Sequence, residues 1–153
     1  MKNKITPFLT YDGQAEEAAN LYTSIFKNSK ITSKMPGPDG KVMSVTFEIE
    51  GQEIMTLNGG ATFKHEVGFS LFVSCETQEE IDAYWTALTS NGGSEGRCGW
   101  CKDKFGVSWQ IIPTVLGQLF SDPDRARAGR GIQAMMGMNK LDIAALKRAA
   151  DGG

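Results

Sequence analysis

Several features that would place this chain in a specialised class are missing from its 153 residues. No run of Lys or Arg forms a basic stripe, and the 16 basic residues are mixed with 18 acidic ones, so the sequence predicts no nucleic-acid partner. No apolar stretch approaches the roughly 18 residues of a membrane span. The apolar run near the N-terminus ends at Asp12, too early for a signal-peptide core. We therefore expect a soluble, cytoplasmic protein with no membrane partner and with reduced cysteines.

Histidine is almost absent as well, because His65 is the only one. A zinc site would require His65 to converge with Cys75, Cys98 and Cys101, and the spacing of these residues does not indicate such convergence. Cys98 and Cys101 have the spacing of a redox pair, but a working pair stands at the start of a helix and this segment leads into a strand. We expect a loop that contains two thiols, whose role the sequence leaves open.

What the sequence does contain is an internal repeat. The segment 16–25 falls on the segment 79–88 at an offset of 63 residues, with a Glu-Glu pair and an aromatic residue in matching places. An apolar run precedes each segment, at Ile5–Tyr11 and at Phe69–Cys75. The same order of elements therefore occurs twice.

Hydrophobic periodicity assigns the elements of each repeat. Apolar residues at spacings of three and four predict helices at Ala15–Phe26 and Gln78–Thr89, the second capped by Thr77. Alternation and turn residues predict further strands at Met43–Glu50, Glu53–Leu57, Arg97–Lys102 and Val107–Ile112. Glu48 and Glu53 flank the first of these hairpins, and we expect both to face solvent.

The remaining residues read as helix. Thr114 is a suitable cap for a helix at Val115–Phe120, Ser121–Pro123 is a helix-start signal, and Asp142–Ala150 continues the helical pattern. The fold class is therefore α+β: a first βαβββ module at 1–64, a second at 65–115 and a helical C-terminal tail at 116–153, all in a single domain. The apolar residues of the tail need a surface to cover, on this chain or on a partner.

Several segments together resemble one family. They are Ile5–Ala18, Leu57–Gly60, Cys75–Ile81, Gly99–Trp100 and Lys102–Pro113. These segments are similar to PhnB-like proteins of the glyoxalase/bleomycin-resistance/dihydroxybiphenyl dioxygenase (vicinal oxygen chelate) superfamily. The resemblance implies paired βαβββ modules, eight main strands in a curved sheet, and a homodimer. Such proteins also carry the label 3-demethylubiquinone-9 3-methyltransferase. However, no glycine-rich loop between a strand and a helix is present to hold S-adenosylmethionine, since Gly92 and Gly93 follow a helix.

The resemblance also implies where a metal would lie. Metal-dependent members place a His or Glu ligand on the first and the last strand of each module, and the repeat register assigns Thr6, Met55, Phe69 and Gln110 to these positions. Phenylalanine has no donor atom, and a glutamine would bind a divalent ion only weakly. We therefore expect no metal and no other cofactor.

A ligand pocket is the remaining candidate site. The residues proposed to line it are Phe8, Asn58, Phe69, Trp100, Phe105, Trp109 and Gln110. Aromatic side chains on a concave sheet suit the stacking of a flat or apolar ligand, and the two amides can orient a polar group. Two alternatives remain open: core packing for Trp100 and Trp109, and structural hydrogen bonding for Asn58 and Gln110.

Three functions are compatible with these features. The first is a metal-independent protein that binds a small molecule of unknown identity. The second is an enzyme of the lyase, isomerase or dioxygenase type, which needs a metal or an acid–base pair. The third is a structural or regulatory homodimer without a ligand. The sequence favours the first, and it does not decide whether the modules pair within one chain or between two.

Overall fold

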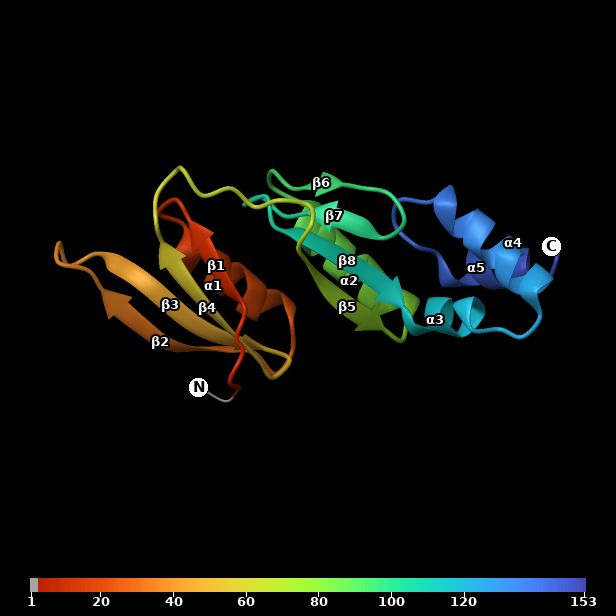
Figure 1. Cartoon of the computed structure of the whole chain (residues 1–153), viewed down its shortest axis with the longest axis horizontal. Helices are drawn as coiled ribbons and strands as arrows, with labels where there is room; N and C mark the ends of the chain where they lie inside the picture. The colour runs from red at the N-terminus through yellow and green to blue at the C-terminus, as the bar shows by residue number, and fades with distance from the viewer. Residues whose placement is uncertain (1–2) are drawn as a thin grey trace. The chain divides into compact units, whose positions relative to one another are not determined.

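The computed structural model describes residues 3–153. The chain divides into two compact units, Met1–Lys64 and His65–Gly153, and each is described here by itself (Figure 1). Within residues 3–153, none of the helices combines the length and the apolar character needed to cross a membrane.

The first unit is a four-stranded sheet with one helix. Its elements are β1 (Phe8–Tyr11), α1 (Ala15–Ile25), β2 (Lys30–Pro36), β3 (Val42–Ile49) and β4 (Gln52–Asn58). The strand order is β1-β4-β3-β2; β1 runs parallel to β4, and the other neighbours are antiparallel (Figure 1). We call this sheet A. Its element order is βαβββ, as the repeat predicts.

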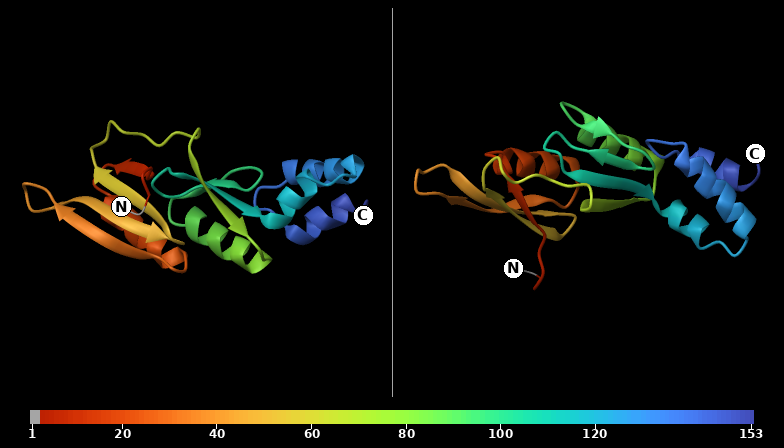
Figure 2. Two further views of the ribbon diagram at one scale, coloured as in Figure 1. Left: turned by 60° about the horizontal axis from the view of Figure 1, so that its bottom comes forward. Right: turned by 45° about the horizontal axis from the view of Figure 1, so that its top comes forward.

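The second unit repeats this topology and adds three helices. Its sheet, sheet B, contains β5 (Ser70–Cys75), β6 (Ser94–Glu95), β7 (Trp100–Lys102) and β8 (Ser108–Pro113), with helix α2 (Gln78–Thr89) after the first strand. The order β5-β8-β7-β6 matches that of sheet A. The tail forms α3 (Thr114–Phe120), α4 (Arg125–Met136) and α5 (Ile143–Ala150), which lie beyond the end of β8 (Figure 2).

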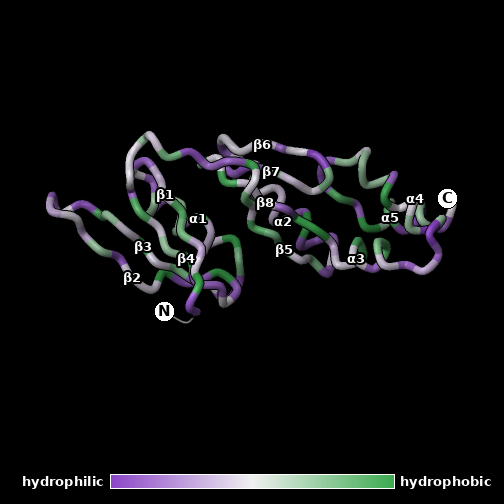
Figure 3. Tube along the Cα trace, viewed as in Figure 1, coloured by the Kyte–Doolittle hydropathy of each residue, from purple (hydrophilic) through white to green (hydrophobic). Residues whose placement is uncertain are grey.

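Each sheet has one face covered by its own helix. In the first unit, the rings of Tyr22 on α1 and Phe47 on β3 lie 5.9 Å apart, and the hydroxyls of Tyr11 and Tyr22 are 3.2 Å apart. In the second, Trp85 on α2 is buried and donates a hydrogen bond of 2.6 Å from Nε1 to Glu95. Figure 3 shows that the C-terminal part of β8 is hydrophobic. Because side chains alternate along a strand, the opposite face of each sheet carries a different set of residues, and we call it the open face.

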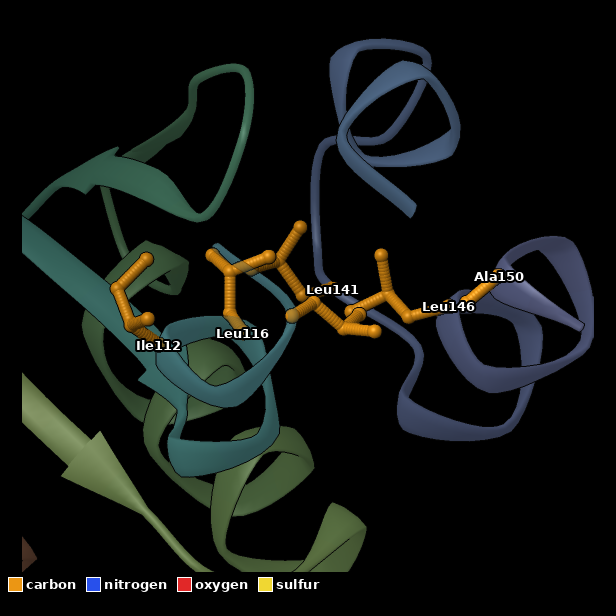
Figure 4. Close-up of a cluster of buried hydrophobic side chains, with 6 residues drawn as sticks. Ile112, Leu116, Leu141, Leu146 and Ala150 are labelled. Carbon is orange, nitrogen blue, oxygen red and sulfur yellow. The ribbon is translucent and has the colours of Figure 1, made fainter. Parts of the chain in front are cut away.

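The tail helices form a small core of their own with the end of β8. The buried members are Ile112, Leu116, Leu119, Leu141, Leu146 and Ala150. Figure 4 shows five of these side chains lying together between the end of β8 and α5. Arg127 on α4 adds ion pairs of 2.7 Å to Asp122 and 2.9 Å to Asp151. The surface that the tail needs to cover is thus supplied, at least in part, by its own unit.

The predicted elements are largely confirmed, and the differences lie at their ends. Helix α2 has the predicted bounds, and Thr77 caps it by accepting a hydrogen bond from the Glu80 amide at 3.2 Å. Strand β1 begins only at Phe8, the first residue in register with β4, although the Pro7 carbonyl still accepts from the Met55 amide at 3.0 Å. Helix α4 begins at Arg125, since the Asp124 side chain, rather than Ser121 or Asp122, accepts from the first free amides of the helix.

Candidate functional site

The open face of sheet B carries a row of two aromatic side chains with an amide between them. Phe72 on β5 and Trp100 on β7 are both register partners of Gln110 on the central strand β8. The neighbouring register pair, Val73 and Ile111, points to the α2 side. Phe72 is 59% exposed, and Trp100 and Gln110 are half-buried. Phe72, Gln110 and Trp100 therefore form one accessible line across three strands, which we call the sheet B row.

Gln110 is held in place from one side only. Its Nε2 donates a hydrogen bond of 3.0 Å to Ser70 Oγ, and this is the only hydrogen bond of its side chain within residues 3–153. Oε1 thus remains available to accept from another donor. The next register line on the same face, Ser70, Ser108 and Lys102, adds two hydroxyls and an exposed ammonium group.

Sheet A has a less polar equivalent of this row. Its register line is Phe8 on β1, Met55 on β4 and Thr46 on β3, and Phe8 is 53% exposed. The line contains one aromatic residue and no amide. The amide-bearing row is therefore on sheet B, whereas sheet A offers no amide in the equivalent row.

Trp109 and Phe105 do not belong to the sheet B row. Trp109 pairs with Leu71, so its side chain lies on the α2 side, where it is 1% exposed. Its Nε1 donates to Asp103 Oδ2 at 3.0 Å, while Asp103 Oδ1 accepts from the amides of Phe105 and Val107 at 2.9 and 3.1 Å. Phe105 lies in the turn between β7 and β8, with the Lys104 ammonium 5.5 Å from its ring centre. Trp109 is thus a core residue that locks this turn.

Asn58 has a structural role in the first unit. Its Oδ1 accepts from the Ala15 amide at 2.9 Å, and its Nδ2 donates to the Val42 carbonyl at 3.0 Å. Because Ala15 is the first residue of α1 and Gln14 makes no side-chain cap, Asn58 supplies the cap from the end of β4. Of the two alternatives that the sequence left open for Asn58, the geometry favours structural hydrogen bonding.

The positions assigned to a metal from the repeat register need a correction. Thr6 and Phe69 both lie just before the first strand of their unit, not on it. The two helices repeat at an offset of 63 residues. On the first strands, however, the register partners of Met55 and Gln110 are Phe8 and Phe72, which are 64 residues apart. The difference arises because the linker between β1 and α1 is one residue longer than the linker between β5 and α2. Phe72 is thus a site candidate that the offset of 63 does not identify. Strand alternation places its side chain on the face opposite that of Val73.

The residues at the corrected positions are no better as metal ligands. Phe8, Met55, Phe72 and Gln110 include two side chains without a donor atom. Within residues 3–153, no three His, Cys, Asp or Glu side chains gather in a way that would hold an ion. The side chains at these four positions therefore do not fit a divalent metal.

Cys75 and Cys101 lie on the α2 side of sheet B, whereas Cys98 lies in a loop. Cys101 lies on the α2 side of β7, where burial, followed by the charges of Asp103 and Glu95, raises the pKa of its thiol to about 12. Burial raises the pKa of Cys75 to about 12 as well. Cys98 sits in the loop before β7 with a left-handed backbone (φ 57°), not at a helix start. All three are free thiols.

Glu48 and Glu53 differ from the solvent-facing residues that the hairpin pattern predicts. They are register partners in β3 and β4, and they are only 9% and 8% exposed. Alternation places them on the open face, because Phe47 and Ile54 occupy the side of α1. The alternation of the hairpin predicts on which face of sheet A these carboxylates lie, but it does not predict that they are buried there.

Comparison with known proteins relates this chain to one family. A family model described as 3-demethylubiquinone-9 3-methyltransferase matches residues 3–112. The PhnB protein of Bacillus cereus is 37% identical, with 73% of this chain and 100% of that chain covered and a TM-score of 0.68. A search of the curated proteins found no match.

More distant structures share the fold alone. Protein PA1353 of Pseudomonas aeruginosa is 18% identical, with 73% of this chain and 98% of that chain covered and a TM-score of 0.61. The fosfomycin resistance protein FosX of Listeria monocytogenes is 16% identical, with 80% and 99% covered and a TM-score of 0.58. Together with the two βαβββ units and the match to PhnB, these findings show that the chain belongs to the PhnB-like 3-demethylubiquinone-9 3-methyltransferase family and has the fold of the vicinal oxygen chelate superfamily.

Proposed function

We propose that this protein binds a flat or apolar small molecule on the open face of sheet B, without a metal and without turnover. The observation that supports it is the sheet B row, in which Phe72 and Trp100 stand on either side of Gln110. Aromatic rings offer stacking area with little loss of side-chain entropy. An amide between them selects for a ligand that carries a hydrogen-bond donor. Phe105 and Trp109, which lie elsewhere, are not part of this proposal.

A methyl-transfer function, which the family description suggests, does not fit the residues present. A methyl donor such as S-adenosylmethionine is usually held by a glycine-rich loop that opens a helix. Gly92 and Gly93 instead follow α2, and a Cβ added at Gly93 would overlap the carbonyl oxygen of Leu88. Gly93 is thus required for close packing between the end of α2 and β7, and it does not form a loop for a methyl donor.

A metal-dependent reaction is also a poor fit. A structure of FosX from Listeria monocytogenes contains Mn(II) and a sulfate ion. In this chain the positions next to Met55 and Gln110 are Phe8 and Phe72, which cannot coordinate an ion. The enzyme alternative would therefore need a metal held elsewhere or an acid–base pair on the open face of sheet B, where Lys102 is the only charged residue of the strand positions described above.

We also propose that the protein acts as a homodimer in the cytoplasm. Outside the sheet B row, large apolar side chains are exposed at Phe63, Val67 and Phe69. Such exposed apolar residues are characteristic of surfaces that another protein covers, and a second copy is the simplest occupant. The three free thiols are consistent with a reducing compartment.

A fluorescent probe tests the binding proposal. We would titrate the protein with 8-anilinonaphthalene-1-sulfonate, a flat aromatic anion, and compare Trp100→Ala, Phe72→Ala and Gln110→Ala with the control Phe120→Ala, which removes an exposed ring on α3. Stacking and a neutral hydrogen bond predict a loss of affinity of roughly threefold to tenfold in each of the three variants. The melting temperature of Gln110→Ala should fall by no more than a few degrees. Equal losses in the control would remove the open face of sheet B from the site.

Native mass spectrometry with and without a chelator distinguishes the alternatives. A dimer without metal mass, whose affinity for the probe is unchanged by the chelator, agrees with the proposal. A stoichiometric metal that the chelator removes would favour the enzyme. A dimer that binds no probe and none of a panel of flat aromatic compounds would favour the structural role.

A further inference from the structure

The segment between α4 and α5 runs along the body of the second unit. It extends from Met136, the last residue of α4, to Ile143, the first residue of α5, and we call it the strap. The family model ends at residue 112, so the strap belongs to a part of the chain outside the family match. Its polar contacts nevertheless go to elements inside that match, the loop between β6 and β7 and the start of α2.

The strap binds the backbone of the loop that leads into Trp100. The amide of Cys98 donates to the Met138 carbonyl, and the amide of Gly99 donates to the Asn139 carbonyl, both at 2.8 Å. These two amides are consecutive, and a short loop of this kind has no strand partner for them. The strap carbonyls thus satisfy donors that would otherwise depend on solvent.

A side chain of the same loop completes the end of α4. Arg97 donates from its guanidinium to the Met136 carbonyl at 2.8 Å. Helix α4 has no basic residue in its last turn, so the cation that suits the C-terminal end of its dipole is supplied by Arg97 from the loop between β6 and β7. The loop and the strap therefore stabilise each other.

The other end of the strap is attached to α2. The Gln78 side chain donates to the Leu141 carbonyl at 3.0 Å and accepts from the Ile143 amide at 2.9 Å. Lys140 forms an ion pair of 2.8 Å with Asp82, one turn further along α2. A single amide side chain thus bridges the backbone on both sides of the N-cap of α5.

The loop itself has a backbone that needs such support. Cys98 is a non-glycine residue in the left-handed region, and Gly99 follows it with φ 85°. A Cβ on Gly99 would lie 2.7 Å from a methyl carbon of Ile112 and 3.1 Å from one of Leu141. The Gly99 carbonyl accepts from the Ile111 amide at 2.8 Å, next to Gln110 on β8. Gly99 is therefore fixed between the strap on one side and the central strand on the other.

We infer that the strap is a positioning element for the ligand site: it fixes the Arg97–Gly99 loop and so sets the place of the Trp100 ring beside Gln110. Trp100 is the first residue of a strand of only three residues, so the sheet alone gives it few restraints. The inference rests on the proposed ligand site, and its structural half can be tested without a ligand.

The structural half is tested by hydrogen exchange and by the indole signals in nuclear magnetic resonance spectra. Arg97→Ala and Gln78→Ala loosen the two ends of the strap, and Lys147→Ala on the exposed side of α5 is the control. We expect roughly tenfold faster exchange of the Cys98 and Gly99 amides in the first two variants, the size expected for losing one or two hydrogen bonds. The Trp100 indole signal should shift or broaden. Signals of the buried Trp85 and Trp109 should stay in place and so show that the unit is folded.

The binding half is tested by a double-mutant cycle with 8-anilinonaphthalene-1-sulfonate as the probe. Arg97→Ala should weaken probe binding by roughly threefold when Trp100 is present and should have no further effect in a Trp100→Ala background. Equal effects in both backgrounds would overturn the positioning role, because the loss would not pass through Trp100. Unchanged exchange rates of the Cys98 and Gly99 amides would overturn the inference that the strap fixes this loop. If the wild-type protein does not bind the probe, the proposed ligand site is wrong for flat aromatic anions. The hydrogen-exchange and indole results still decide whether the strap fixes the loop before Trp100.

Discussion

Sheet A and sheet B have the same strand order and the same position of the helix in the chain, but they are held together differently. In sheet A, the edge strand β2 and its neighbour β3 contain seven and eight residues, while the equivalent strands β6 and β7 of sheet B contain two and three. Sheet A therefore covers α1 with long paired strands. The short strands β6 and β7 of sheet B cannot cover α2 in the same way. Helices α3 to α5 and the strap add contacts at the end of this sheet. A repeated unit can thus lose strand length where another segment replaces the missing contacts.

The largest test of this comparison is Leu141→Ala. Leu141 is fully buried in the tail core and lies next to Gly99. Removing its side chain should lower the free energy of unfolding by about 3 kcal/mol, a common value for a buried leucine. The change is measured by urea denaturation, and hydrogen exchange shows where it acts. Faster exchange in β6 to β8 with unchanged β2 and β3 agrees with the comparison, and equal acceleration in sheet A contradicts it.

The turns of the two central hairpins give the next largest effect. Asp103→Ala should cost about 2–3 kcal/mol, because the buried Nε1 of Trp109 and two turn amides lose their acceptor. The matched change in the turn between β3 and β4 is Glu50→Ala, whose side chain is exposed and which should change stability by less than about 0.5 kcal/mol. Thermal denaturation of the two variants measures the difference. A similar loss in both would mean that the turns do not differ in this way.

The helix caps give a smaller difference. Asn58→Ala removes one cap of α1 and one hydrogen bond to Val42, and Thr77→Ala removes only the cap of α2. We expect a loss of about 1.5–2 kcal/mol for the first and about 1 kcal/mol for the second. Both variants are compared by urea denaturation. A larger loss for Thr77→Ala would indicate that α2 depends on its own cap more than on the strap.

The smallest expected effect is on the stability of the protein at acidic pH, through the ion pair of Asp82 with Lys140. The hydrogen bond from Lys140, followed by that from Gln78, lowers the pKa of Asp82 below its ordinary value. A carboxylate with a lowered pKa contributes stability above the pKa of the unfolded chain, and this contribution is lost as pH falls through the pKa of the folded state. Because Asp82 is exposed, we expect less than about 1 kcal/mol. Asp82→Asn should flatten the stability curve of the protein in this acidic range, and an unchanged curve would exclude the pair as a source of acid sensitivity.

The helices and most strands could be predicted from the sequence because their signals are local. The spacing of Ile81, Trp85 and Leu88 is enough to define the buried side of α2, and Thr77 marks its start. Strand β2 could not be assigned in the same way. Its residues are almost all exposed and show no alternation, so its place as an edge strand depends on pairing with β3.

The candidate site was harder to predict because it depends on which face each helix covers. Trp109 and Gln110 are neighbours in the sequence, and both are credible pocket residues on chemical grounds. Alternation allows only one of them on the open face, and the docking of α2 against Trp109 leaves this place to Gln110. Phe72 reaches the sheet B row by the same alternation, although the repeat offset points to Phe69.

The sequence by itself determined the two βαβββ units and their helices, and its resemblance to PhnB-like proteins indicated the family. The units and helices follow from hydrophobic periodicity, which does not require knowledge of distant contacts. Only the tertiary structure decided that Asn58 caps a helix, that Trp109 is core, and that the strap holds the loop before Trp100. The first and the last of these join segments about 40 residues apart, and the second depends on the side of sheet B that α2 covers. The backbone groups that take part carry no side-chain signal.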